Sequence, residues 1–149
     1  MKGYIEAICT SEIKGVVKNQ IDEAEFVENW GIAGDAHAGD WHRQISLLAG
    51  ESIDRMKEKL PDLPAGAFAE NIITRGIRLD NIRIGDNIRI GQEIVFQVTQ
   101  IGKKCHKACA IRTQTGDCIM PREGIFAQIQ HGGRVKTGDK IEVIDERLI

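Results

Sequence analysis

The chain has 149 residues, 42% of them hydrophobic and 28% charged, which is typical of one globular domain. We therefore predict a single domain over residues 1–149. The formal net charge is −2, and basic residues are scattered, so we expect no nucleic-acid partner. No apolar run approaches the ~20 residues of a membrane span. We therefore expect no membrane contact and a cytoplasmic location, where cysteines stay reduced.

Most of the predicted elements are short β-strands. In residues 93–100, Ile94, Phe96 and Val98 lie on one face, with Glu93, Val95 and Gln97 on the other, as in a half-buried strand. Between residues 50 and 60, Ile53, Met56 and Leu60 recur at helical spacing. In chain order we predict strands at 3–9 and 44–49, a helix at 50–60, strands at 71–74, 77–79, 87–90 and 93–100, a helix at 121–130 and a strand at 140–144.

Two glycine–aspartate pairs, Gly85-Asp86 and Gly138-Asp139, each precede a predicted strand. Glycine supplies a positive φ and aspartate bonds nearby backbone, so both pairs predict tight turns. Short strands with regular turns favour a mainly β fold with a few short helices, closed or partly closed into a small barrel.

A glycine-rich segment over residues 31–43 carries Asp35, His37 and Arg43. Glycines allow close backbone approach to a ligand, and a guanidinium binds phosphate oxygens in a bidentate fork. The segment therefore predicts either a phosphate-binding loop or a polar surface loop. Two interpretations stay open for Arg122, at the start of the second predicted helix. It binds an anion at the helix N-terminus, or it is a solvated residue or the partner in a salt bridge.

Cys105 follows the best-patterned strand and has Lys103, Lys104, His106 and Lys107 as neighbours. Positive neighbours favour the thiolate and lower the pKa of a thiol, which predicts a reactive cysteine rather than a buried inert one. Cys9 lies in an apolar strand and is predicted to be a core residue. The less favoured alternative is a zinc site, whose candidate ligands are Cys105, Cys109 and Cys118 with His106 or His131.

Taken together, several segments resemble the MOSC family, named for the C-terminal domain of molybdenum cofactor sulfurase. The resemblance covers about residues 31–145, in blocks at 31–39 and 43–48, 68–77, 84–91, 98–106, 124–127 and 135–139. It implies a small mixed β-barrel, similar to the barrel domain of pyruvate kinase. The family often has proline directly before its characteristic cysteine, whereas this chain has Lys104.

By this resemblance, Cys105 carries sulfur for the molybdenum cofactor (molybdopterin) or ligates molybdenum. The implied reacting residues are Cys105, Lys103 and His106, with Cys109 as a resolving thiol. The implied cofactor-binding residues are Asp35, His37, Arg43, Glu70 and Asn71. Arg122 joins them if it binds an anion. The expected partners are the cofactor or a molybdoenzyme, with a separate sulfur donor such as a cysteine desulfurase, or an electron donor.

Three functions stay open at this point. The first is binding the cofactor or carrying sulfur on Cys105. The second is reduction of N-hydroxylated compounds with a separate electron donor. The third is a non-catalytic domain that binds or senses the cofactor or an oxyanion. Pyridoxal phosphate is not expected, because 149 residues leave no room for a desulfurase domain.

Overall fold

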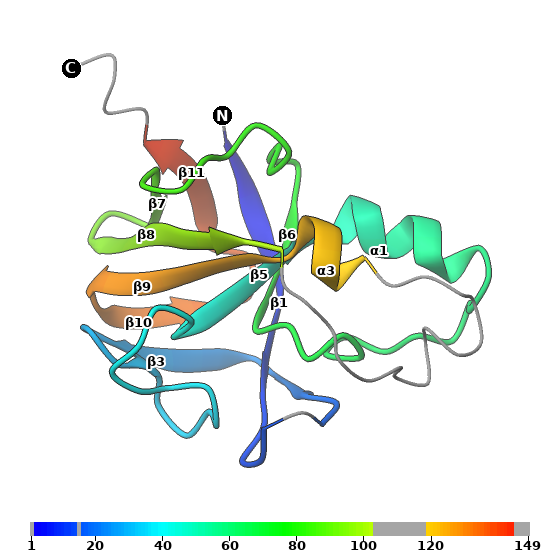
Figure 1. Ribbon diagram of the computed structural model, residues 1–149, viewed down its shortest axis with the longest axis horizontal. Coiled ribbons are helices and arrows are strands. Elements are labelled where there is room, and N and C mark those ends of the chain that lie inside the picture. Colours follow the sequence, from blue (N-terminus) through cyan, green and yellow to red (C-terminus); the bar gives the residue numbers. More distant parts are fainter. Residues whose placement is uncertain (1, 15, 103–118, 145–149) are drawn as a thin grey trace.

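Seven strands close into a β-barrel in the computed structural model, which describes residues 2–14, 16–102 and 119–144 (Figure 1). In spatial order they run β11-β7-β8-β9-β5-β6-β1, and pairing of β1 with β11 completes the circle. The β5–β6 pair is parallel and the others are antiparallel, so the mixed β-barrel that we predicted is confirmed. The strands are β1 (Lys2–Thr10), β5 (Ile45–Ala49), β6 (Ile72–Arg75), β7 (Asn87–Ile90), β8 (Ile94–Ile101), β9 (Ile125–His131) and β11 (Lys140–Ile144).

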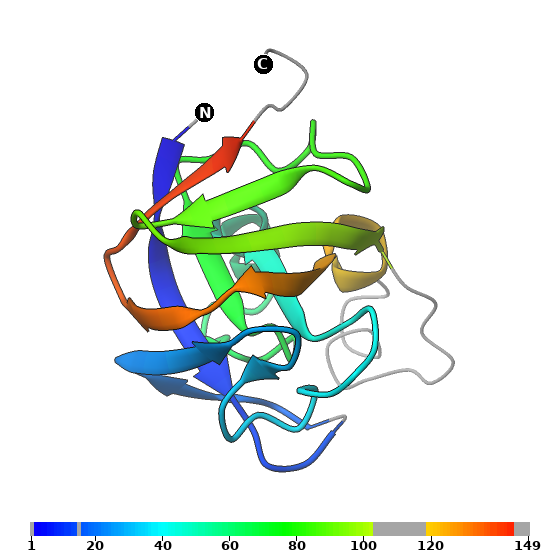
Figure 2. The ribbon, with the colours of Figure 1, turned by 90° about the vertical axis from the view of Figure 1, so that its left-hand side faces the viewer.

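Smaller elements lie around the barrel (Figures 1 and 2). β2 (Asn19–Ile21) pairs with β1, and β3 (Glu23–Val27) lies between β4 (Gly31–Ile32) and β10 (Gly133–Lys136) in a second sheet. The helices α1 (Gly50–Lys57) and α3 (Met120–Glu123) lie together on one side of the barrel. Within the described ranges, no helix is long and apolar enough to span a lipid bilayer.

The alternation of side chains along the strands creates two hydrophobic cores. Ile94, Phe96 and Val98 of β8 belong to the first core, where Phe96 stacks on Phe26 of β3 at a centroid distance of 5.5 Å. The second core combines residues of α1 with outward-facing strand residues. Its members include Cys9, Leu48, Ile53, Met56, Phe68, Ile73 and Phe126. Cys9 is fully buried, as predicted.

Both predicted glycine–aspartate turns are present. Gly85 and Gly138 have φ angles of 96° and 95°, in the region that favours glycine. Asp86 accepts a hydrogen bond from the backbone N–H of Arg83 at 2.9 Å, and Asp139 accepts one from that of Lys136 at 2.8 Å. These turns lead into β7 and β11 and so set where each strand begins.

The predicted helix at 121–130 is wrong beyond its first turn, because residues 125–131 form β9. Ile125, Ala127 and Ile129 belong to the first core, whereas Phe126 packs in the second. A strand buried on both faces has no alternation of apolar and polar residues, so its pattern is easily mistaken for that of a short buried helix.

Two other expectations also need correction. Residues 77–79 form no strand: Ile77 and Leu79 pack with the first core, but no strand pairs with them. The helix predicted at 50–60 ends at Lys57, although Met56 and Leu60 still pack with the second core. In both places burial produced the apolar pattern without regular backbone pairing.

Candidate functional site

A buried ion pair lies beneath the predicted glycine-rich loop. Lys18, just before β2, places its Nζ 2.7 Å from Oδ1 of Asp35, which follows β4, and both side chains are fully buried. Ser11, just after β1, accepts a hydrogen bond from Lys18 Nζ at 3.1 Å and donates its backbone N–H to Asp35 Oδ1 at 3.1 Å. These contacts join three chain segments and hold the start of the glycine-rich loop against the barrel.

His37 extends this buried network toward the surface. Its Nδ1 lies 3.0 Å from Lys18 Nζ, and its backbone N–H donates to Asp35 Oδ2 at 3.2 Å. The backbone oxygen of His37 accepts a hydrogen bond from the indole N–H of Trp41 at 2.7 Å. The rings of His37 and Trp41 stack with a centroid distance of 6.4 Å. The buried ion pair therefore determines where these two rings lie.

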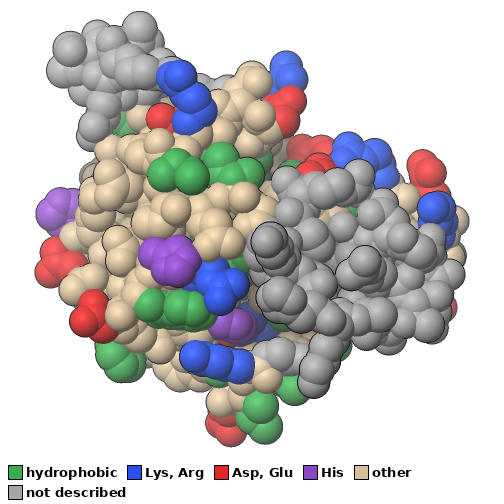
Figure 3. All heavy atoms as spheres, viewed as in Figure 1, with side chains coloured by type: hydrophobic (Ala, Val, Ile, Leu, Met, Phe, Trp, Pro, Cys, Tyr) green, Lys and Arg blue, Asp and Glu red, His purple; other side chains and the backbone are tan. Residues whose placement is uncertain are grey.

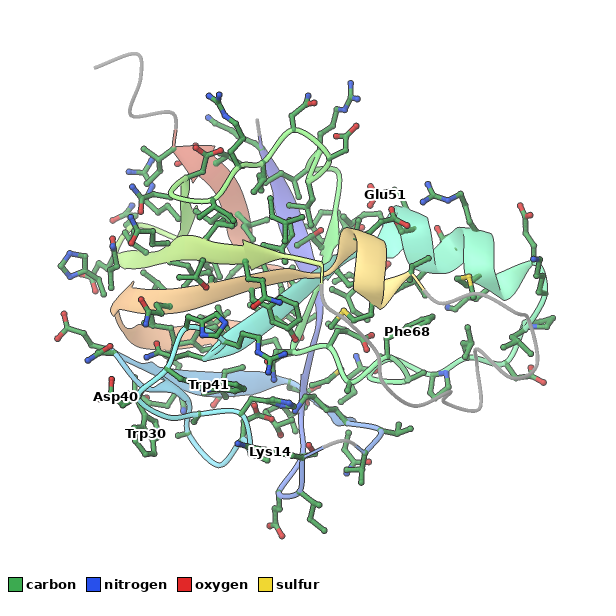
Figure 4. The ribbon with its side chains drawn as sticks, viewed as in Figure 1. Lys14, Trp30, Asp40, Trp41, Glu51 and Phe68 are labelled. Carbon is green, nitrogen blue, oxygen red and sulfur yellow. The ribbon has the colours of Figure 1, made fainter. Side chains whose placement is uncertain are left out.

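Two cations lie over the Trp41 ring. The guanidinium carbon of Arg43 is 4.7 Å from the ring centre and Lys14 Nζ is 4.9 Å from it, within the range of cation–π attraction. Figure 4 shows Trp41 and Lys14 on the same side of the molecule, and Figure 3 shows histidine, basic and hydrophobic side chains gathered on this face. We refer to Lys14, His37, Trp41 and Arg43 as the Trp41 patch.

Arg43 has a buried donor for which the described residues supply no acceptor. Within the described ranges its Nε is buried and has no hydrogen-bond partner, and neither Arg43 nor Lys14 is in an ion pair. Buried donors in folded proteins are normally satisfied, so an unsatisfied one requires an explanation. An anionic ligand with oxygen acceptors would satisfy it, as predicted for this loop.

The Trp41 patch adjoins the end of β8. Gln100 Oε1 lies 2.8 Å from Nε2 of His42, while its Nε2 donates to the backbone oxygen of Gly102 at 2.7 Å. Gly102 is the last described residue before position 103, and its N–H donates to the oxygen of Gly124 at 2.7 Å. The segment that carries Cys105 therefore starts beside the loop that carries His37 and Arg43.

The predicted reacting residues lie outside the described residues. They are Lys103, Cys105, His106 and Cys109, and the same holds for Cys118 and for the side chain of Arg122. His131, the remaining zinc candidate, lies 3.9 Å from Glu28 at an exposed position. Within the described part of the chain, no three His, Cys, Asp or Glu side chains are grouped to hold a metal ion.

Glu70 and Asn71, which the resemblance assigns to cofactor binding, both make buried hydrogen bonds to the backbone. Glu70 accepts from the N–H groups of Gly66 and Phe68 at 3.1 and 2.9 Å. Asn71 accepts from the N–H of Ser46 at 2.9 Å and donates to the oxygen of Cys9 at 3.1 Å. These contacts hold the 66–71 segment against the barrel, and a role toward a cofactor stays a prediction.

Replacing Glu70 by glutamine should change how the stability depends on pH. Burial raises the pKa of Glu70 above 4.5, and hydrogen bonds from Gly66 and Phe68 only partly oppose this. The folded state then keeps a proton that the unfolded state has lost, so the stabilisation by Glu70 is complete below pH 4.5 and is lost as the pH rises through the folded-state pKa. The unfolding free energy of the wild type minus that of Glu70→Gln should therefore fall as the pH rises from 4.5 through the folded-state pKa of Glu70.

Urea unfolding at several pH values measures this difference, with the exposed Glu58→Gln as the matched control. A difference that stays constant or increases with pH would contradict the raised pKa.

Sequence reasoning did not single out Lys18, Ser11, Lys14 or Trp41. Lys18 is one of 20 Lys and Arg residues, and nothing nearby in the sequence marks it as buried. Trp41 lies within the glycine-rich segment, between two candidate residues, and its aromatic side chain is the signal that was overlooked. The resulting arrangement combines an aromatic ring and hydrogen-bond donors with two cations that form no ion pair in the described part of the chain, which suits a ligand with an anionic group and a planar ring.

Comparison with known proteins finds a matching family model and similar solved structures. A family model described as a MOSC domain matches residues 34–142. The crystal structure of the YUAD protein from Bacillus subtilis superposes with a TM-score of 0.79 over 96% of each chain, at 22% sequence identity. That of YiiM from Escherichia coli superposes with a TM-score of 0.68, over 98% of this chain and 71% of YiiM, at 21% identity. These likenesses establish the fold.

One relative has a functional name. A protein called "Reductase" from Gibberella moniliformis is 27% identical over an alignment of 161 positions, which covers 97% of this chain. The aligned region is 27% of that protein, so this chain spans about a quarter of its curated relative.

Proposed function

This chain belongs to the MOSC domain family, and from that premise we propose that it binds the molybdenum cofactor at the Trp41 patch and carries sulfur, or ligates molybdenum, on Cys105. The observation that carries the proposal is the buried Nε of Arg43, a donor beside an aromatic ring that has no partner among the residues the structure describes. A phosphate group is the part of the cofactor that such a donor fits.

The residues present fit the cofactor in two respects. Arg43 and Lys14 would hold its phosphate, since neither cation is in an ion pair within the described residues. Cys105, in the segment that begins beside this patch, would supply a soft thiolate, which suits a polarisable metal or a transferable sulfur. When bound, the cofactor supplies a redox-active metal. The protein supplies the anchoring cations, the aromatic ring and the thiolate.

Replacing Arg43 by methionine should lower the molybdenum content of the purified protein. A hydrogen bond to a charged group contributes about 1.5–3 kcal/mol, so its loss should weaken cofactor retention about 10- to 100-fold. The protein is expressed without oxygen in a host that makes the cofactor, and molybdenum is measured by plasma mass spectrometry.

The matched control is Arg134→Met on β10, which removes an exposed guanidinium that pairs with Glu23 at 3.0 Å. Equal molybdenum in both variants would contradict a role for Arg43. Wild-type protein without molybdenum and without sulfur on Cys105 would contradict the proposal as a whole.

A second candidate is a reductase of N-hydroxylated compounds that takes electrons from a separate donor. The name of the Gibberella moniliformis relative supports it. Its distinguishing measurement is turnover of an amidoxime by molybdenum-loaded protein with a reduced dye as electron donor. Molybdenum retention without turnover would favour a carrier or sensor function.

A further inference from the structure

A cavity of about 500 Å³ is enclosed by residues of α1, α3, the end of β8 and the segment 76–82. Much of its lining is apolar and comes from Ile77, Leu79, Ile82, Ile101 and Ile125. Ile77, Ile82 and Ile125 are buried, whereas Ile101, the last residue of β8, is 42% exposed. Small-molecule sites in proteins have volumes of about 300–1,000 Å³ and are lined mainly by hydrophobic side chains with a few polar groups. The size and lining of this cavity therefore suit a small organic ligand.

The cavity is separate from the Trp41 patch, none of whose residues line it. Two successive residues of β8 contribute to different places: Gln100 contacts His42 in the glycine-rich loop, and Ile101 lines the cavity. Figure 4 shows Glu51, another lining residue, at the start of α1 and well away from Trp41 and Lys14. A ligand of this cavity is therefore inferred independently of the proposed function.

The charges around the cavity are balanced except at one carboxylate. Arg55 pairs with Glu123 at 2.9 Å and Arg78 pairs with Asp80 at 2.8 Å, and all four of these side chains line the cavity. Glu51 lines it too, but within residues 2–14, 16–102 and 119–144 it forms no ion pair. The cavity therefore has a local negative charge that a cationic ligand would balance.

The position of Glu51 is fixed by a hydrogen bond across the cavity wall. Its Oε2 accepts from the backbone N–H of Gly76 at 2.8 Å. Arg75, the residue before Gly76, does not neutralise Glu51, because its guanidinium pairs with Glu6 and Asp54 at 2.7 and 2.6 Å. Among the described residues, no donor is bonded to Oε1 of Glu51. A carboxylate can accept several hydrogen bonds, so Glu51 can receive a donor from a ligand without losing its own anchor.

We propose that this cavity binds a small organic amine, with the apolar body of the ligand against the isoleucines and its ammonium group on the carboxylate of Glu51. Contact with the isoleucines removes apolar ligand surface from water. The ammonium group donates a charge-assisted hydrogen bond to Glu51, and such bonds are about twice as strong as those between neutral groups. Apolar contact and charge together select an amine over a neutral or acidic molecule of the same shape.

Phenethylamine is the probe, because it has an apolar ring and is an ammonium ion at neutral pH. Its neutral and acidic counterparts are 2-phenylethanol and 3-phenylpropionate. In NMR titrations of the nitrogen-15-labelled protein, phenethylamine should give saturable shifts of the backbone N–H signals of Gly76 and Ile82. The alcohol should bind more weakly at the same signals, and the acid should bind most weakly.

Replacing Glu51 by glutamine should weaken phenethylamine binding about 10-fold, which is the lower end of the effect of a hydrogen bond to a charged group. It should leave 2-phenylethanol binding nearly unchanged, because the glutamine oxygen can still accept the Gly76 N–H. Glu58→Gln, at an exposed position just after α1 that does not line the cavity, is the matched control and should alter neither. Ile101→Ala should weaken the amine and the alcohol equally.

Three results would overturn the inference. The first is the absence of saturable shifts at Gly76 and Ile82 with phenethylamine. The second is binding of 3-phenylpropionate as tightly as the amine. The third is equal phenethylamine affinity in the folded Glu51→Gln and Glu58→Gln variants. Molybdenum content plays no part in these measurements, so they judge this cavity separately from the Trp41 patch.

Discussion

Replacing Cys105 by alanine should remove molybdenum, or bound sulfur, from the purified protein almost completely, whereas Cys9→Ala should leave both in place. Cys105 follows a strand end and has lysines and a histidine around it in the sequence, which favours the reactive thiolate. Cys9 is fully buried in the second core, and burial, with the nearby Glu70, raises its pKa to about 12. Its thiol therefore stays protonated and unreactive near neutral pH.

Plasma mass spectrometry measures the metal in both variants, and intact-protein mass spectrometry detects added sulfur. Equal retention by Cys105→Ala and Cys9→Ala would show that the assignment to Cys105 is wrong. Near-stoichiometric zinc that disappears in Cys105→Ala would indicate instead that Cys105, Cys109 and Cys118 are structural ligands. Circular dichroism of each variant establishes that a loss of metal does not reflect a loss of fold.

The barrel was predictable from the sequence where its strands show apolar alternation or form short apolar runs bounded by polar residues. Ile94, Phe96 and Val98 in β8 mark one buried face, and β11 repeats the pattern. β3 and β10 were not predicted, although buried and exposed residues alternate along β3. The other failures occur where both faces are covered, as in β9, or where strands are very short, as in β2 and β4. Burial on two sides removes the polar half of the pattern, and two or three residues are too few to show a period.

The site was predictable only in part, because some of its residues lie together in one segment whereas others are distant in the sequence. Asp35, His37 and Arg43 lie within one segment whose composition suggests a ligand-binding loop. Lys18 reaches Asp35 across 17 residues and His37 across 19, and such a contact depends on how β1, β2 and β4 come together. Local patterns carry no information about this pairing. The role of Lys18 was therefore visible only in the structure.

Removing either member of the Lys18–Asp35 pair should destabilise the protein severely. Both side chains are fully buried and 2.7 Å apart, so Lys18→Met or Asp35→Asn alone leaves one charge buried without its counter-charge. Breaking a buried pair in this way costs about 3–5 kcal/mol. Urea unfolding should therefore show midpoints far below that of the wild type for both single variants. Lys14→Met, which removes an exposed lysine of the same loop region, should change the midpoint little.

The double variant Lys18→Met/Asp35→Asn should be much more stable than the sum of the two single effects predicts. Neither charge of this pair remains in it, and the asparagine oxygen can still accept the N–H groups of Ser11 and His37 that Asp35 accepts at 3.1 and 3.2 Å. Residues in direct contact are expected to show such non-additivity, and the double-mutant cycle measures it. Strictly additive losses would mean that the two charges act independently. The Lys18–Asp35 ion pair would then not be what holds the glycine-rich loop and the ring of His37 in place.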